Sequence, residues 1–134
     1  MVLPINFEDG QLIGLPMGVA TYTVGMMLKI SSGYYVAATV GQGTDIEAVC
    51  MEAGVVGTNG TLLKCISTRG VRFLADTTGE PTLASYQGTY CDITDENKLD
   101  EDATADDLFY IEKVVGPIAN KKVQGWFQHG TVLA

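Results

Sequence analysis

Glycine divides this chain into short segments, and this spacing restricts the fold more than any other feature of the sequence. The 134 residues include 16 glycines, where an average composition of about 7% gives roughly nine. The segments between them are rich in Val, Ile, Thr, Tyr and Phe, which favour extended strands. Short segments of this kind, separated by turn signals, are typical of sandwiches and barrels. The sequence therefore predicts a mostly β fold, either a small β-barrel or a β-tulip or sandwich, with little helix.

The expected strands are defined by β-branched and aromatic residues between these turns. They cover residues 19–24, 26–30, 34–39, 46–52, 61–68, 71–75, 89–93, 108–115 and 121–127, with a last edge strand at 131–133. The turns at Ser31–Gly33 and Asn59-Gly60 favour hairpins, because glycine and asparagine tolerate positive φ. Two segments carry a weaker helix signal: 44–52, where Thr44 would cap the helix, and 102–108.

Composition predicts one globular domain over residues 1–134. Hydrophobic residues make up 46% of the chain and charged residues 18%, and the charged share is below the usual value of about 25%. A chain of this length buries roughly two-thirds of the surface that its unfolded form exposes. It therefore needs no disulfide, metal or cofactor to hold a core. The low charged share also leaves part of the surface neutral or apolar, which suits a protein with an interface to cover.

The charge balance argues against two classes of partner. Sixteen acidic residues against eight basic ones give a net charge of −8. Nucleic acids and anionic membranes are bound mainly through Lys and Arg, and Lys121 and Lys122 are the only adjacent bases. We therefore expect neither nucleic acid nor a membrane as a partner. The first residues lack the basic start and apolar run of a secretory signal, which favours a protein made and kept in a cytoplasm.

The three cysteines, Cys50, Cys65 and Cys91, lie among apolar or β-prone neighbours and have no C-x-x-C spacing. This pattern favours buried, reduced thiols that pack as small hydrophobic side chains. A catalytic thiol or a metal site is the alternative. Zinc is excluded among metals, because the chain lacks paired ligand spacings.

Residues 92–107 hold eight of the 16 acidic residues. Because like charges repel unless water screens them, we expect a long solvated connection between two strands, anchored by Ile93, Leu99 and Leu108. A calcium-binding EF-hand loop does not fit, since Leu99 stands at a ligand position and Asp100 at the glycine position. An irregular calcium site in this segment is the alternative.

No catalytic motif is present in the sequence. His129 is the only histidine and lies in a turn-like Gln-His-Gly segment. Neither a G-x-S-x-G elbow nor the lysine of a phosphate-binding loop occurs. Trp126 is the only tryptophan, and aromatic residues total 8%, so core or interface packing is expected rather than a sugar-stacking platform. The sequence therefore predicts a protein that is not an enzyme and uses no cofactor.

Three segments near the C-terminus carry a resemblance to a known family. Residues 87–100 contain the pattern G-T-x-x-D-I-T, residues 105–115 the pattern D-L-F-x-I-x-K-V, and residues 121–127 the pattern K-x-V-x-G-x-F. An acidic loop joins the first pattern to the second. This order resembles the C-terminal part of the head decoration, or cement, proteins of tailed bacteriophages. The likeness covers residues 87–127, and upstream it extends only to the general layout of glycine-bounded strands.

This resemblance implies a small β-barrel or tulip-like fold on the exterior of a virion capsid, made in the cytoplasm of a bacterial host. The implied partner is the major capsid protein, bound without covalent links over the joints between its subunits, so that the shell is stabilised. Self-association as a trimer is implied, with a monomer or dimer as alternatives. Two other functions stay open: another virion, tail or host-side structural protein, or a ligand-binding or enzymatic β-barrel whose pocket brings carboxylates to His129 or Trp126.

The N-terminal segment is expected to contribute to the interface. Residues 1–10 are apolar at first and precede the first strong strand. They are expected either to form an extended arm that pairs with an edge of a capsid sheet or to pack on the protein's own core. The candidate capsid or subunit contacts are Val2, Leu3, Pro4, Ile5, Phe7 and Trp126.

Overall fold

The computed structural model describes residues 1–5, 11–39, 45–82, 86–103 and 106–129. Nearly all of its regular structure is β, and the described helical structure is slight, with a 3₁₀ turn, η2, over Ile118–Asn120. The prediction of a mostly β fold with little helix is confirmed. The strands are β1 (Val2–Pro4), β2 (Leu12–Met17), β3 (Ala20–Tyr22), β4 (Met27–Ser31), β5 (Tyr34–Ala37), β6 (Ala48–Cys50), β7 (Gly54–Val56), β8 (Thr61–Ser67), β9 (Phe73–Asp76), β10 (Thr89–Asp95), β11 (Lys98–Asp100), β12 (Phe109–Val114) and β13 (Lys122–Phe127).

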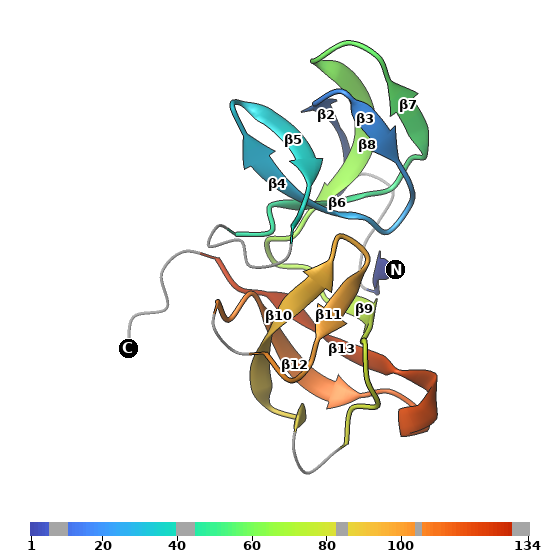
Figure 1. Ribbon diagram of the computed structural model, residues 1–134, viewed down its shortest axis with the longest axis vertical. Helices are drawn as coiled ribbons and strands as arrows, with labels where there is room; N and C mark the ends of the chain where they lie inside the picture. The colour runs from blue at the N-terminus through green and yellow to red at the C-terminus, as the bar shows by residue number, and fades with distance from the viewer. Residues whose placement is uncertain (6–10, 40–44, 83–85, 104–105, 130–134) are drawn as a thin grey trace.

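Two groups of strands follow one another along the long axis of the molecule (Figure 1). In the first group, β2, β5, β4, β6 and β8 pair in that order and close into a barrel, with β3 and β7 as a two-stranded ribbon beside it. The second group is a six-stranded sheet in the order β1-β9-β13-β12-β10-β11. We call it the C-terminal sheet, although its first strand comes from the N-terminus.

Two clusters of buried side chains form the core. The smaller one lies within the barrel and includes Met17, Tyr22 and Leu28. The larger one joins barrel residues such as Val49 to the inner side of the C-terminal sheet. There Phe127 meets the edges of two other phenylalanine rings, with centroid distances of 5.2 Å to Phe73 and 4.9 Å to Phe109. The barrel and the sheet therefore share one continuous apolar contact.

The two predicted hairpin turns have different outcomes. Ser32 and Gly33 join β4 to β5, with Ser31 opposite Tyr34, and both turn residues have positive φ (52° and 84°). This is the two-residue turn that glycine favours, so the first prediction is confirmed. Asn59-Gly60 also precedes a strand, but β7 pairs with β3 and β8 pairs with β2 and β6. The hairpin predicted at Asn59-Gly60 is wrong, because the chain crosses there from the ribbon to the barrel.

The weak helix signal at 44–52 is also wrong where the structure describes it. Residues 48–50 form β6, which is buried between β4 and β8. Ala48, Val49 and Cys50 each have at most 1% of their surface exposed. Central strands that are covered on both sides carry apolar residues without alternation, and this hides their period from sequence inspection. The last expected strand, 131–133, lies outside the described residues.

The acidic segment is folded rather than a solvated connection, which corrects that prediction. β10 and β11 form an antiparallel hairpin inside it, with Ile93 opposite Leu99. Both side chains are buried, as predicted, and so is Leu108. At the tip, the carbonyl of Glu96 accepts a hydrogen bond of 2.6 Å from the amide of Met27 in the barrel. The hairpin therefore helps to join the sheet to the barrel.

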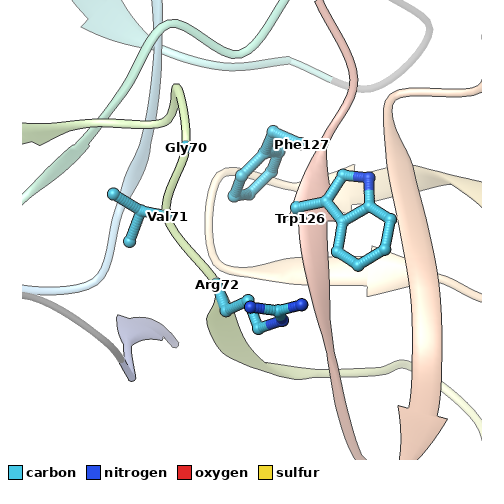
Figure 2. Close-up of a pocket in the computed structure, with 5 residues that line it drawn as sticks. All are labelled: Gly70, Val71, Arg72, Trp126 and Phe127. Atoms are coloured by element: carbon cyan, nitrogen blue, oxygen red, sulfur yellow. The ribbon is translucent and has the colours of Figure 1, made fainter.

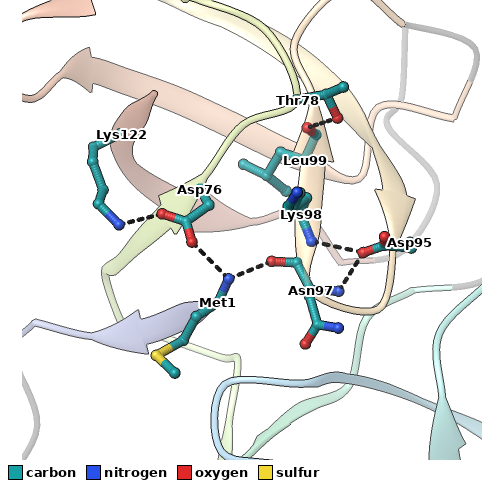
Figure 3. Close-up of polar contacts among 8 residues, drawn as sticks. All are labelled: Met1, Asp76, Thr78, Asp95, Asn97, Lys98, Leu99 and Lys122. Carbon is teal, nitrogen blue, oxygen red and sulfur yellow. Dashed lines mark hydrogen bonds and ion pairs between the residues drawn. The ribbon is translucent and has the colours of Figure 1, made fainter. Parts of the chain in front are cut away.

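Two aspartate side chains within the acidic segment accept hydrogen bonds from backbone amides in its turns. Asp95 Oδ1 accepts hydrogen bonds from the amides of Asn97 and Lys98, at 2.7 and 3.1 Å, and so shapes the hairpin tip (Figure 3). Asp92 is 7% exposed, and its Oδ1 accepts from the amides of Asp106 and Asp107 at 2.9 and 2.8 Å. Local bonds of this kind are common for aspartate in turns. They explain why so many acidic residues fold compactly here.

The N-terminal residues belong to the protein's own sheet. Val2, Leu3 and Pro4 pair with Ala75, Leu74 and Phe73 of β9, and Ile5 donates its amide to the carbonyl of Arg72. Residues 2–5 therefore pair with the protein's own sheet rather than forming a free arm, and Val2 alone among them is buried in the core. Residues 6–10, including Phe7, lie outside the described residues.

One carboxylate connects this edge strand to the sheet. Asp76 accepts a hydrogen bond of 2.8 Å from the amino group of Met1, and its other oxygen accepts from Lys122 (Figure 3). Partial burial alone would raise the pKa of Asp76, but the hydrogen bonds from Lys122 and the Met1 ammonium outweigh it and hold that pKa below its usual 3.8. The folded state therefore favours the ionised form of Asp76.

We predict that Asp76→Asn loses about 1 kcal/mol of stability at neutral pH, a modest value because these pairs are partly exposed. A lowered pKa in the folded state gives stability that is present above the unfolded pKa and lost as pH falls through the folded one. The difference in stability between wild type and Asp76→Asn should thus begin to shrink as the pH falls below about 4, and should vanish only below the lowered pKa of the folded state. Urea denaturation between pH 7 and pH 3 measures it. Glu80→Gln, at an exposed residue, is the control. An equal loss of stability in that variant would contradict the stabilising role of the Asp76 contacts with Met1 and Lys122.

Candidate interaction surface

The C-terminal sheet has one face in the core and one turned outward. Side chains alternate along each strand. Phe73, Phe109, Ile111, Val123 and Phe127 point inward and are at most 3% exposed. The strand register then places a second set on the opposite side, all of them partly or well exposed. These outward residues, which we call the outer face, are Leu3, Ile5, Arg72, Leu74, Tyr90, Tyr110, Glu112, Gln124 and Trp126.

An aromatic row crosses the outer face. Tyr90 on β10 lies opposite Tyr110 on β12, which lies opposite Trp126 on β13. The two tyrosine rings meet edge to face at a centroid distance of 5.1 Å, and Tyr110 stacks on Trp126 at 4.7 Å with 26° between the planes. Such pairs add about 0.5–1.5 kcal/mol each beyond the area they bury. The aromatic row is thus already ordered in the free protein.

Arg72 completes the row on the far side of Trp126. Its guanidinium carbon lies 5.7 Å from the centre of the Trp126 ring, within the range of a cation–π contact (Figure 2). Because β13 lies between β9 and β12, Tyr110 and Arg72 approach the indole from opposite sides. Tyr110 therefore stacks on one flat face of Trp126, and Arg72 lies over the other at a longer distance, so the orientation of the indole is fixed within the molecule. The exposed edge of Trp126 is left for a partner.

Polar groups hold Arg72 in this position. Its Nε donates to Glu112 Oε1 and Oε2, at 3.2 and 3.4 Å. Gln124 Nε2 donates to the same Oε1 at 2.9 Å. The hydrogen bonds from Gln124 and then from Arg72 lower the pKa of Glu112, so its carboxylate stays ionised. The row is consequently bordered by a charged, hydrogen-bonded edge.

A pocket of about 240 Å³ opens beside this row. Its lining consists of Gly70, Val71, Arg72, Trp126 and Phe127, drawn in Figure 2. These residues come from the connection between β8 and β9 and from the end of β13, where the barrel meets the sheet. The pocket combines two aromatic side chains with one guanidinium. The pocket makes this end of the outer face concave, and a side chain of a partner protein could insert there.

The structure brings together three of the residues expected to make contacts. Leu3 is on the same face as Trp126, because it pairs with Leu74, which in turn pairs with Gln124. Ile5 follows on the same edge and is 48% exposed. Val2 differs: it is fully buried, so in this fold it is a core residue and not a surface contact. Pro4 opposes the inward Phe73 and is partly buried.

Sequence inspection did not identify Tyr90, Arg72 and Leu74 as parts of this surface. The sequence does carry one signal for each of them, because each is next to a residue that is buried on the other side of the strand. Alternation alone shows which residues share a side of one strand. It does not show that Tyr90, Tyr110 and Trp126 are aligned, because that depends on strand pairing between distant segments.

His129, named above only for the alternative of a ligand-binding or enzymatic β-barrel, makes a contact between two strand ends. Its Nε2 lies 2.6 Å from Thr68 Oγ1, and Thr68 Oγ1 donates to the carbonyl of Ile46 at 2.7 Å. Since the hydroxyl hydrogen is used by Ile46, Nε2 must donate to Thr68. Burial, followed by the charge of Arg69, lowers the pKa of His129, which favours neutral imidazole. The contact ties the end of β13 to the end of β8.

Potential metal ligands do not converge in the described part of the chain. No three His, Cys, Asp or Glu side chains there lie close enough to hold a metal ion. Glu101 in the acidic segment is 5% exposed and packs against Gly79. The three cysteines are free thiols, and all are buried, as predicted. No described helix is long and apolar enough to cross a membrane.

Comparison with protein-family models, with curated proteins and with solved structures finds no match for this chain.

Proposed function

We propose that this protein is a head decoration, or cement, protein of a tailed bacteriophage, which binds the outer surface of the capsid and stabilises the shell by non-covalent contacts. The order of C-terminal motifs first suggests this role. The observation that carries it furthest is the outer face, which gathers Leu3, Ile5 and Trp126 on one rigid sheet. Their partner in this proposal is the major capsid protein.

The outer face has the composition of a protein–protein contact. Interfaces are rich in tyrosine, tryptophan and arginine, and their strongest contributions come from anchors surrounded by a polar rim. Here the aromatic row supplies anchors, and Glu112, Gln124 and Arg72 supply the rim. Because the rings already pack on one another, binding orders few new side chains. That reduces the entropic cost of association, which is about 0.5–1.5 kcal/mol for each immobilised side chain.

Charge adds a second requirement for the partner. The protein carries a net charge of −8, so a capsid surface that binds it is expected to be basic around the contact. Complementary charge raises association rates and makes them sensitive to salt. Each bound copy then stabilises the assembled shell, because it binds that state and not the free subunits. Assembly as a trimer, with monomer or dimer as alternatives, belongs to the same proposal.

The proposal is tested with capsids of the cognate phage assembled without this protein. Purified protein should co-sediment with them to a saturating number of copies per shell, and should raise the temperature at which the shells break. Binding should weaken as salt increases. Failure to co-sediment at micromolar protein would contradict the proposal. A thermal shift with a small molecule, in the absence of capsid binding, would instead favour the ligand-binding β-barrel.

A further inference from the structure

Two of the three cysteines face each other across neighbouring strands of the barrel. β6 and β8 are antiparallel, with Cys50 directly opposite Cys65. On either side of this pair, the amide of Met51 donates to the carbonyl of Lys64 at 2.9 Å, and the amide of Thr68 donates to that of Glu47 at 3.3 Å. Hydrogen-bonded and non-hydrogen-bonded pairs alternate along such a ladder. Counting from these bonds, Cys50 and Cys65 form a non-hydrogen-bonded pair.

That position suits a covalent link between the two side chains. In a non-hydrogen-bonded pair the Cα atoms are about 4.5 Å apart and the side chains are closest, and disulfides require Cα separations of about 4.4–6.8 Å. Both thiols belong to the same core cluster inside the barrel. Cys91 lies in the other cluster, on the inner side of the C-terminal sheet. Cys50 and Cys65 are therefore close to each other in the barrel, whereas Cys91 is packed among different residues in the sheet.

The two thiols also differ in acidity in a way that favours reaction. A hydrogen bond between them is the main reason that the pKa of Cys50 falls to about 7, and the same bond raises the pKa of Cys65. Burial raises the pKa of Cys91. The thiolate is the form that attacks a disulfide. Cys50 is thus the better nucleophile and Cys65 the resolving thiol.

We propose that Cys50 and Cys65 are a redox pair, which a low-molecular-weight disulfide such as oxidised glutathione converts into a cross-strand disulfide within the barrel. The Cys50 thiolate attacks the glutathione disulfide and releases one glutathione thiolate, which takes up a proton. The Cys65 sulfur, losing its proton, then attacks the mixed disulfide and releases the second glutathione. One Sγ–Sγ bond is formed, two electrons pass to glutathione disulfide, and two glutathione thiols result.

The setting of this reaction rests on the proposed function, whereas the reaction itself does not. A reducing bacterial cytoplasm keeps both thiols free while a capsid is decorated. After the virion leaves the cell, an oxidising medium allows the bond to form when the barrel opens locally, because both cysteines are fully buried in the closed fold. The link would then stabilise the decoration protein in the environment where the shell must last.

The experiment uses the full chain, unfolded and then refolded in glutathione buffers of increasing oxidation, so that burial of the thiols cannot delay equilibrium. Free thiols are then alkylated, and the disulfide is located by peptide mass analysis. Before alkylation, the expected monomer is about 2 Da lighter than the reduced chain, because two thiol hydrogens are lost. After alkylation it carries one label, on Cys91, and the link joins Cys50 to Cys65, which lie opposite each other on β6 and β8. The disulfide closes the loop of chain between Cys50 and Cys65, and this should raise the Tm by roughly 10 °C.

Matched variants separate this pair from other thiol reactions. Cys91→Ala should keep both the link and the rise in Tm, whereas Cys50→Ala and Cys65→Ala should lose both while remaining folded by circular dichroism. A folded protein with three free thiols in the most oxidising buffer would overturn the proposal, and so would a link that uses Cys91. Capsid co-sedimentation, measured separately with reduced protein, reports on the proposed function alone.

Discussion

Replacing Gly125 by alanine is expected to lower the free energy of unfolding by about 3 kcal/mol or more. A Cβ at this position in β13 would lie 1.8 Å from the carbonyl oxygen of Tyr110 and 2.8 Å from a ring carbon of Phe109. The first contact is with backbone, so rotating a side chain cannot relieve it. β12 must move away from β13. That movement separates the ladder that holds Tyr110 against Trp126, so the outer face is disturbed together with the core.

Urea denaturation of both proteins, followed by circular dichroism, measures this loss. Gly57→Ala is the matched control, because a Cβ there meets no atom within 4 Å and its φ is not in the left-handed range. That variant should stay within about 0.5 kcal/mol of wild type or gain slightly from reduced chain entropy. Similar small effects in both variants would mean that β12 and β13 are not as close as described.

Changes on the outer face are expected to weaken capsid binding by about 100-fold, which is roughly 2.8 kcal/mol at about 1.4 kcal/mol for each factor of ten. Trp126→Ala removes the centre of the aromatic row, stacked on Tyr110 at 4.7 Å. Ile5→Asp places a charge on the apolar edge of the same face, at a residue that is 48% exposed. In the bound state that carboxylate would be buried without a partner, which is costly.

The capsid measurement compares each variant with Val55→Asp. Val55 is 79% exposed and lies in β7 of the ribbon, on the barrel side of the molecule (Figure 1). This control makes the same kind of change away from the outer face and should bind like wild type. Thermal unfolding of each variant separates lost binding from lost folding, and Ile5→Asp should remain folded because Ile5 is a partly exposed edge residue outside the buried core. Equal binding by Ile5→Asp and wild type would exclude the edge from the contact.

The parts of the fold that sequence predicts best are those decided by neighbours in the chain. The turn at Ser32-Gly33 was predictable because positive φ at two adjacent positions strongly favours one kind of hairpin. The buried anchors Ile93 and Leu99 were predictable because they are apolar residues among acids. The prediction for the acidic segment as a whole was wrong, because backbone bonds to Asp92 and Asp95 compensate for crowding that composition alone makes unfavourable.

Features that depend on distant pairing were beyond the sequence. β1 pairs with β9, with Leu3 opposite Leu74. No local sequence feature favours this partner strand over a strand of a capsid protein. β2 was not expected, since Gly14 and Pro16 make its sequence look like a turn. The candidate site was accordingly predicted in part. Leu3, Ile5 and Trp126 were named, but their common face required the strand order. Val2 and Pro4 were named as well, and they lie on the inner side of their strand.

The single tryptophan of this chain lies at the centre of the proposed contact, so it can report on binding directly. Trp126 is replaced biosynthetically by 5-hydroxytryptophan, which can be excited apart from the tryptophans of the capsid, and its quenching by acrylamide is measured with and without capsids. Quenching should fall several-fold when the protein is bound, because the edge of the indole becomes covered. Unchanged quenching on fully decorated capsids would show that a different face makes the contact.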